Sequence, residues 1–137
     1  MADDPLQRLY DSPITKWTGM RLVARSDERA ELELPARDEF TQAEGVVHGG
    51  MLAMLADSAA VFLLWPHAGP DRWMTSIDFQ MHFLKGAKPG GEPLRAIATL
   101  LRKGSTVAVA ESEIWQGNER VCKGTFTYLF GARRKDA

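Results

Sequence analysis

The feature that most constrains this sequence is an apolar segment of twenty residues, Val46 to Trp65, which contains no Lys, Arg or Glu. A helix of that length is long enough to cross a lipid bilayer. However, the segment contains Asp57, and an aspartate near the middle of a membrane span raises the free energy of insertion by about 2.5–3.5 kcal/mol. The basic flanks that orient such spans are also absent. The segment therefore predicts a helix buried inside a protein, surrounded by the rest of its own chain.

The composition suits a single soluble domain built around this helix. The chain has 137 residues, 45% of them hydrophobic, and a formal net charge of −1. Such a length supports one core, and the lack of a basic surplus argues against a nucleic-acid partner. The sequence holds one cysteine, Cys122, no metal-binding cluster of Cys and His, and no signal-peptide pattern. We expect a cytoplasmic protein without metal or membrane anchor.

The remaining sequence predicts short strands packed around the helix. Residues 1–18 form an N-terminal helical segment, capped by Asp4 and ended by Pro13. Two strands joined by a turn at 25–29 follow, and Pro66 to Asp71 then contains helix breakers. The later predicted strands are 76–83, where Ile77, Phe79, Met81 and Phe83 alternate with polar residues, then 94–101, 106–115 and 121–130, with 131–137 as a frayed tail. Tight turns between strands favour antiparallel pairing. The result is an α+β domain in which a curled antiparallel sheet wraps a long central helix.

The start and the middle of the helix carry candidate functional groups. Gly49 and Gly50 follow His48 where backbone N–H groups lack helical acceptors and the dipole is positive, which suits an oxyanion as well as tight packing. Asp57 lies among apolar residues, where an unpaired carboxylate is costly, so it is either bonded in the fold, with Ser58 as a local partner, or functional. Gly49 and Asp57 are eight residues apart, about 12 Å along a helix. Only two antiparallel copies of the helix would bring them to one carbonyl group.

The motif His48-Gly49-Gly50, with Asp57 nine residues after the histidine, resembles the hotdog-fold acyl-CoA thioesterases of the phenylacetate-pathway (PaaI-like) branch. Residues 55–59, 75–79 and 83–87 are similar to this family too, and the resemblance spans about residues 19–129. It implies one hotdog domain over residues 1–137 that hydrolyses an acyl- or aryl-CoA thioester to the free acid and CoA. It also implies a homodimer, associated as a dimer of dimers, and no cofactor beyond the CoA of the substrate.

The resemblance further implies roles for individual residues. The Gly49 amide would polarise the thioester carbonyl, Asp57 of the partner subunit would act as general base or nucleophile, and His48 would orient the site. A hydroxyl that positions water corresponds to Ser76, or to Thr75 in a loop aligned one residue differently, and Gln42 stands where the family often has Asn. The residues expected to contact substrate are Gly50, Thr75, Arg102, Lys103 and Gly104, with Lys85 and Lys88 as further candidates for the CoA phosphates.

Two other functions stay open at this stage. A non-catalytic acyl-CoA binding or sensor protein could use the same groove, and Gln42 in place of Asn favours that alternative. A hydratase of the same fold would need an Asp and a His close together, and no histidine follows Asp57 within the helix. A serine hydrolase is disfavoured because the sequence around Ser58 lacks the Gly-x-Ser-x-Gly motif.

Overall fold

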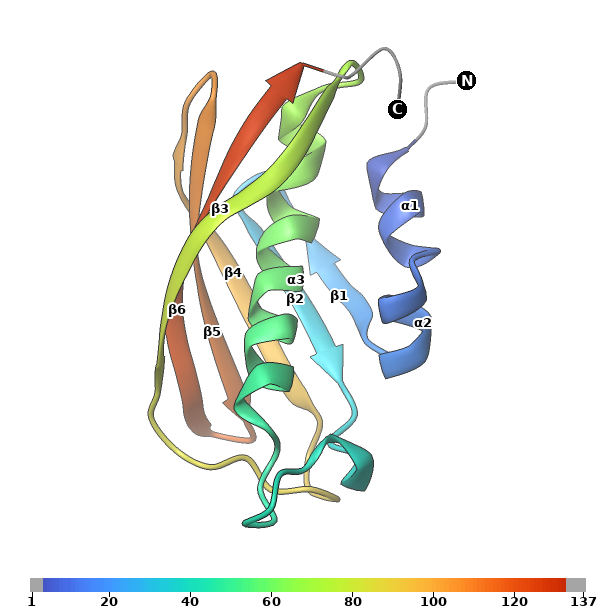
Figure 1. The fold of residues 1–137 in the computed structure, drawn as a ribbon, viewed down its shortest axis with the longest axis vertical. Helices are drawn as coiled ribbons and strands as arrows, with labels where there is room; N and C mark the ends of the chain where they lie inside the picture. The colour runs from blue at the N-terminus through green and yellow to red at the C-terminus, as the bar shows by residue number, and fades with distance from the viewer. Residues whose placement is uncertain (1–3, 133–137) are drawn as a thin grey trace.

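The structure is a computed structural model that describes residues 4–132 as a curled six-stranded antiparallel sheet wrapped around one long helix (Figure 1). The helices are α1 (Pro5–Tyr10), α2 (Pro13–Thr18), a 3-10 turn (Asp38–Phe40) and α3 (Gly49–Ala68). The strands are β1 (Arg21–Arg25), β2 (Arg29–Leu34), β3 (Arg72–Phe83), β4 (Leu94–Lys103), β5 (Val107–Gln116) and β6 (Glu119–Ala132). This architecture confirms the predicted α+β hotdog fold.

The strand order β1-β2-β4-β5-β6-β3 places β3 at an edge of the sheet. Antiparallel hairpins join β1 to β2, β4 to β5 and β5 to β6, as the tight turns predicted. By contrast, β3 pairs with β6 and not with β4, the next strand along the chain, so residues 84–93 cross over at the end of the molecule where α3 begins (Figure 1). Within residues 4–132, one side of β3 therefore has no strand beside it.

The central helix α3 continues past Pro66, which the sequence predicted to end it. A proline has no N–H to donate to the carbonyl four residues earlier, here that of Phe62. Arg25 on β1 donates from Nε to the Phe62 carbonyl at 2.9 Å and from Nη2 to the Leu63 carbonyl at 2.8 Å. The guanidinium thus takes the place of the missing helical donor, and the helix runs on to Ala68.

Two smaller predictions at the termini need correction. Asp4 caps α1 as predicted, accepting a hydrogen bond from the Leu6 N–H at 2.9 Å. Pro13, however, also opens a second helix, α2, behind the Ser12 cap. The tail predicted from residue 131 starts later, because residues 131 and 132 still belong to β6 and pair with β3. Residues 133–137 lie outside the described residues.

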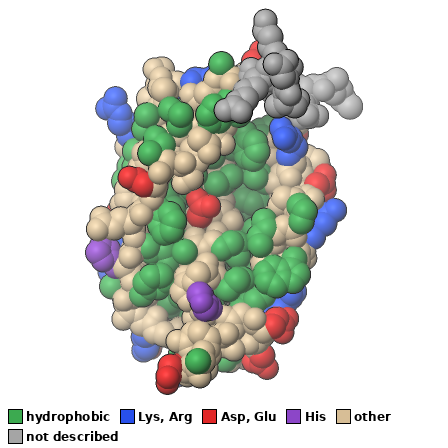
Figure 2. Space-filling view, in the orientation of Figure 1, with side chains coloured by type: hydrophobic (Ala, Val, Ile, Leu, Met, Phe, Trp, Pro, Cys, Tyr) green, Lys and Arg blue, Asp and Glu red, His purple; other side chains and the backbone are tan. Residues whose placement is uncertain are grey.

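The core lies between α3 and the concave face of the sheet. By length and composition α3 could span a membrane, with a mean hydropathy of 1.4 over its most apolar window. Nine of its side chains are buried in the fold, as expected of a core helix. Its less buried side shares a face of the molecule with β3, and hydrophobic side chains gather on that face (Figure 2).

Strand β3 departs from simple alternation at one position. Ser76 pairs with Tyr128 and Asp78 pairs with Thr127, so Ile77 between them has no partner on β6. Because facing residues of an antiparallel pair project to the same side, this bulge puts Ser76 on the helix-facing side together with Phe79, which stacks on Phe126 at 5.2 Å. The alternating pattern predicted Ser76 on the opposite face from Phe79, and the extra residue is the reason that it was wrong.

The predicted burial of the apolar β3 residues is also incomplete. Ile77, Phe79 and Phe83 remain 52%, 49% and 56% exposed. They lie on an edge strand, and no strand among residues 4–132 covers its outer side. The sheet therefore ends in an apolar, unpaired edge, a feature that isolated proteins usually avoid.

Candidate active site

One free backbone N–H remains in the first turn of α3. His48 caps the helix, and its Nδ1 accepts a hydrogen bond from the Gly50 N–H at 2.7 Å. The N–H groups of Met51 and Leu52 both donate to the His48 carbonyl. Within residues 4–132, the Gly49 N–H has no acceptor. The positive end of the helix thus presents a single unused donor, at the residue that the sequence pointed to.

Gly49 and Gln42 line a common cleft of about 410 Å³, a volume within the range of small-molecule sites. The loop before α3 positions both residues, since the Gln42 N–H donates to the Val46 carbonyl at 2.9 Å and the His48 N–H to the Phe40 carbonyl at 2.7 Å. The Gln42 side-chain oxygen accepts a hydrogen bond from the Glu44 N–H. That bond leaves the Gln42 amide nitrogen available to the cleft.

Gly49 and Gly50, the two glycines after His48, have different structural roles. A side chain at Gly50 would place its Cβ 2.9 Å from Nδ1 of His48, so Gly50 is required by the cap itself. A Cβ at Gly49 would lie 3.2 Å from Cε1 of Phe83, a ring that also lines the cleft. His48 uses Nδ1 as an acceptor, which leaves Nε2 as the ring nitrogen that can donate. This arrangement fits the orienting role implied for His48.

Asp57 lies two turns further along α3 and is bonded to Tyr128 of β6. The Tyr128 hydroxyl donates to the Asp57 carboxylate, at Oδ1, and lies 3.2 Å from the Asp57 carbonyl oxygen. Ser58, the local partner considered from the sequence, instead lies 3.6 Å from the Met54 sulfur. Burial raises the pKa of Asp57, and the hydrogen bond from Tyr128 partly opposes that rise. A carboxylate with a raised pKa is suited to accept a proton near neutral pH.

Ser76 is brought to the Asp57 side of the sheet, and Thr75 is not. Ser76 faces Tyr128 across the β3–β6 ladder, and Thr75 faces Leu129, the next residue along. Consecutive residues of a strand project to opposite faces. Ser76 and Tyr128 therefore lie on the helix-facing side of the sheet, where Tyr128 bonds to Asp57 of α3, and Thr75 lies on the outer face.

The predicted site residues thus fall into two groups within one chain. The first, at the start of α3, comprises Gln42, His48 and Gly49; the second comprises Asp57 and Ser76. Because α3 is a regular helix from Gly49 to Ala68, Gly49 and Asp57 are separated by about 12 Å along its axis. Arg102 and Lys103 are the last residues of β4 and Gly104 begins the turn to β5, at the opposite end of the sheet from the start of α3 (Figure 1). Gly104 there closes the hairpin through its N–H to the Val107 carbonyl at 2.8 Å.

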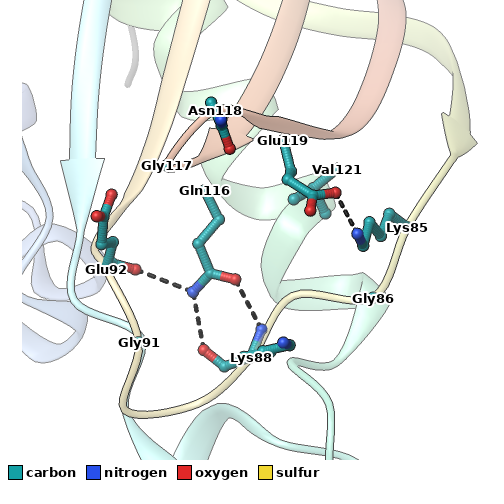
Figure 3. Close-up of a pocket in the computed structure, with 10 residues that line it drawn as sticks. All are labelled: Lys85, Gly86, Lys88, Gly91, Glu92, Gln116, Gly117, Asn118, Glu119 and Val121. Carbon is teal, nitrogen blue, oxygen red and sulfur yellow. Dashed lines mark hydrogen bonds and ion pairs between the residues drawn. The ribbon is translucent and has the colours of Figure 1, made fainter.

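A second hollow of about 270 Å³ adjoins the cleft and shares Lys85 and Gly86 with it (Figure 3). Gln116 holds the loop at residues 88–92 in place. Its side-chain oxygen accepts a hydrogen bond from the Lys88 N–H at 2.8 Å, and its amide nitrogen donates to the Lys88 and Glu92 carbonyls at 2.8 and 2.9 Å. Lys85 is paired with Glu119. Of the basic residues considered from the sequence, Lys85 is the one that lines the Gly49 cleft. From the sequence it was only a further candidate, after Arg102 and Lys103.

Other chemistry finds little support among the described residues. Between residues 4 and 132 no group of three or more His, Cys, Asp or Glu is placed to hold a metal ion. Burial raises the pKa of the Cys122 thiol to about 12, which makes it a poor nucleophile.

The sequence analysis missed Tyr128 as a site residue. A signal was present: Phe126, Tyr128 and Phe130 alternate along β6 and all face inward. A buried tyrosine needs a hydrogen-bond partner for its hydroxyl, and Asp57 is an isolated carboxylate in the apolar helix. The sequence does not show how β6 lies against α3, and that placement was needed to recognise that Tyr128 bonds to Asp57.

Comparison with known proteins identifies the family and supports the fold. Residues 44–123 match the family model of the thioesterase superfamily. Medium/long-chain acyl-CoA thioesterase YigI of Escherichia coli is 28% identical over 139 residues, covering 90% of this chain and 88% of that protein. Conserved protein PA5202 of Pseudomonas aeruginosa superposes with a TM-score of 0.83 at 27% identity, over 92% of this chain and 99% of that one.

The fold is shared more widely than the sequence. The PaaI protein of the E. coli phenylacetic acid degradation operon superposes with a TM-score of 0.84 at 18% identity, over 95% of this chain and 94% of that one. At this identity the likeness is one of fold. The matched family model and the relative named as an acyl-CoA thioesterase complete the assignment: the chain belongs to the thioesterase superfamily and is a thioester hydrolase of the hotdog fold.

Proposed function

We propose that the protein hydrolyses an acyl- or aryl-CoA thioester, with Asp57 of one protomer and the Gly49 amide of the other acting on the same carbonyl group. The observation that carries the proposal is that one helix holds both a partly buried carboxylate and one unused N–H. The two are too far apart to meet within one chain. A second, antiparallel copy of α3 brings each to the other.

The reaction follows from these groups. Asp57 accepts a proton from water, and the water oxygen forms a bond to the thioester carbonyl carbon. The carbonyl oxygen becomes negative and is stabilised by the Gly49 N–H and the positive end of α3. When the C–S bond breaks, the thiolate of CoA takes the proton, and the acid is released. Ser76, on the same face as Asp57, is placed to orient the water, and water is the only co-reactant needed.

The apolar edge of β3 supports the dimer on which this site depends. Its unpaired backbone and the exposed side chains of Ile77, Phe79 and Phe83 are suited to pairing with β3 of a second copy. An isologous contact of this kind is two-fold symmetric, so the strands and the adjacent helices run antiparallel. We propose the homodimer as the smallest active unit; its association into a dimer of dimers and a cytoplasmic location remain predictions.

The acyl group is proposed from the comparisons. The relative named as a medium/long-chain acyl-CoA thioesterase covers most of the chain, and the phenylacetate-operon protein shares the fold. Medium-chain, long-chain and aromatic acyl-CoA thioesters are therefore the panel to test. The cleft of about 410 Å³ beside Gly49 would be completed by the second subunit.

The test measures thiol release from this panel with the wild type, Asp57→Asn and Asp57→Ala. We expect wild-type turnover and a loss of about 10²-fold or more in both variants. Wild-type-like rates in both would remove Asp57 from the mechanism. Tight binding of acyl-CoA without any thiol release would instead favour the non-catalytic sensor.

A mixing experiment tests whether the site is shared. Protomers carrying Asp57→Asn are refolded together with protomers in which Gly49→Pro removes the amide donor. In a mixed dimer one of the two sites holds both mutations and the other holds neither, so an equal mixture recovers about a quarter of the wild-type rate. If each site lay within one chain, no activity would return.

A further inference from the structure

The inner face of β6 carries three large aromatic residues in a row, Phe126, Tyr128 and Phe130, all at most 2% exposed. Packing alone is satisfied by phenylalanine at the first and the last of these positions. Only the middle position has a hydroxyl, and this hydroxyl reaches Asp57 on α3. A hydroxyl is costly to bury, so its presence at Tyr128 alone indicates a function other than packing.

The contact fixes one of the two carboxylate oxygens. Tyr128 donates to Oδ1 of Asp57 and lies 3.2 Å from the carbonyl oxygen of the same residue, which ties the side chain to its own backbone. Within residues 4–132, Oδ2 accepts no hydrogen bond, and no fully buried side-chain oxygen or nitrogen lacks a partner. Oδ2 is therefore the oxygen that retains contact with solvent.

We propose that Tyr128 is a positioning residue for thioester hydrolysis: by holding Oδ1 it turns Oδ2 of Asp57 toward the water beside Ser76. Ser76 is the residue that faces Tyr128 across the β3–β6 ladder, so the water would lie between a hydroxyl on the edge strand and the free carboxylate oxygen. The proposal rests on the proposed function, in which Asp57 is the base.

The electrostatics of the pair support this role. Burial raises the pKa of Asp57, and the Tyr128 hydrogen bond lowers it. The pKa of Tyr128 is itself raised by burial and by the adjacent carboxylate, so the hydroxyl keeps its proton and stays a donor at neutral pH. The hydrogen bond thus favours the ionised carboxylate that catalysis requires.

The test compares Tyr128→Phe with a matched control, Ser112→Ala. Ser112 is buried on β5 and donates to the Ala56 carbonyl at 2.9 Å, one residue before Asp57. Each variant removes one buried hydroxyl that bonds to α3, but only Tyr128→Phe removes a bond to the carboxylate. We expect the acid limb of the kcat profile to move up by about one pH unit in Tyr128→Phe, and kcat on the plateau to fall about tenfold. Ser112→Ala should keep the wild-type profile.

A purely structural role predicts a different result. Tyr128→Phe and Ser112→Ala would then lower the melting temperature to a similar extent and leave both pH profiles at the wild-type position, which overturns the proposal. Titration of ¹³C-labelled aspartate gives a readout that does not depend on activity. If the wild type releases no thiol, the proposed function fails, and an Asp57 carboxyl pKa that is the same in wild type and Tyr128→Phe overturns the role of Tyr128 as well.

Discussion

Replacing Gly49 by proline would remove the proposed oxyanion donor while leaving the helix intact. Gly49 is the first residue of α3, the position at which proline is favoured, and its N–H makes no hydrogen bond within residues 4–132. The preceding residue, His48, has φ −60° and ψ 134°, a conformation that a following proline permits. The substitution therefore deletes one N–H at a backbone position that suits proline.

The control is Gly49→Ala, which adds a Cβ but keeps the N–H. Both variants place that Cβ about 3.2 Å from Cε1 of Phe83, which requires the ring to move by a few tenths of an ångström. Any loss through this contact is therefore common to both. Loss of one oxyanion-hole donor costs about 10²–10³ in kcat, or about 2.7–4 kcal/mol. We expect a few-fold loss in Gly49→Ala and a further loss of about 10²-fold or more in Gly49→Pro.

The assay is thiol release from the best acyl-CoA of the panel, with kcat and KM determined separately for the three proteins at equal concentration. Thermal unfolding of each variant checks that α3 still forms. Equal kcat values in Gly49→Pro and Gly49→Ala would refute the assignment, because the two differ in the amide donor and share the added carbon.

Two further predictions concern stability. Because burial raises the pKa of Asp57, its ionisation opposes folding: the penalty is absent below the ordinary carboxyl pKa of about 3.9 and is complete above the raised value. Asp57→Asn should then lose about 10²-fold or more in turnover yet have a higher urea midpoint than the wild type at pH 7, with the difference shrinking toward pH 3.5. A lower midpoint at pH 7 would contradict this. Arg25→Met should lower the free energy of unfolding by about 2–3 kcal/mol, since it leaves the Phe62 carbonyl without a donor. In a Pro66→Ala background the helix supplies an N–H to that carbonyl, and the loss should be about 1 kcal/mol. Equal losses in both backgrounds would contradict the view that Arg25 replaces the missing helical donor.

The overall fold could be predicted because its main signals are local. The apolar segment with a glycine pair at its start predicted α3, and alternation together with the turn residues between strands predicted the sheet. What the sequence did not reveal depends on contacts between distant elements. The donation from Arg25 that carries α3 past Pro66 joins residues 37 positions apart, and the bond between Asp57 and Tyr128 joins residues 71 positions apart.

The candidate site was predicted in part for the same reason. Gly49 and Asp57 stand out within one segment, because glycines at a helix start and a carboxylate in an apolar helix are unusual locally. The choice between Thr75 and Ser76 required the register of β3 against β6. Alternation, the only local guide, favoured the wrong face for Ser76 because it assumes a strand without interruption.

The bulge at Ile77 divides β3 into two parts with opposite phase. Upstream, the even-numbered Ser76 faces the helix; downstream, the odd-numbered Phe79 and Phe83 do. One strand therefore offers both the hydroxyl of the proposed active site and an apolar surface on a single side. Deleting Ile77 would restore regular alternation and keep Ser76 on the same side as Phe79, because Ser76 would then stand directly before Asp78 and still face Tyr128. The extra residue thus changes the phase of the strand between Ser76 and Phe79, and both side chains lie on one face because Ile77 between them has no partner on β6.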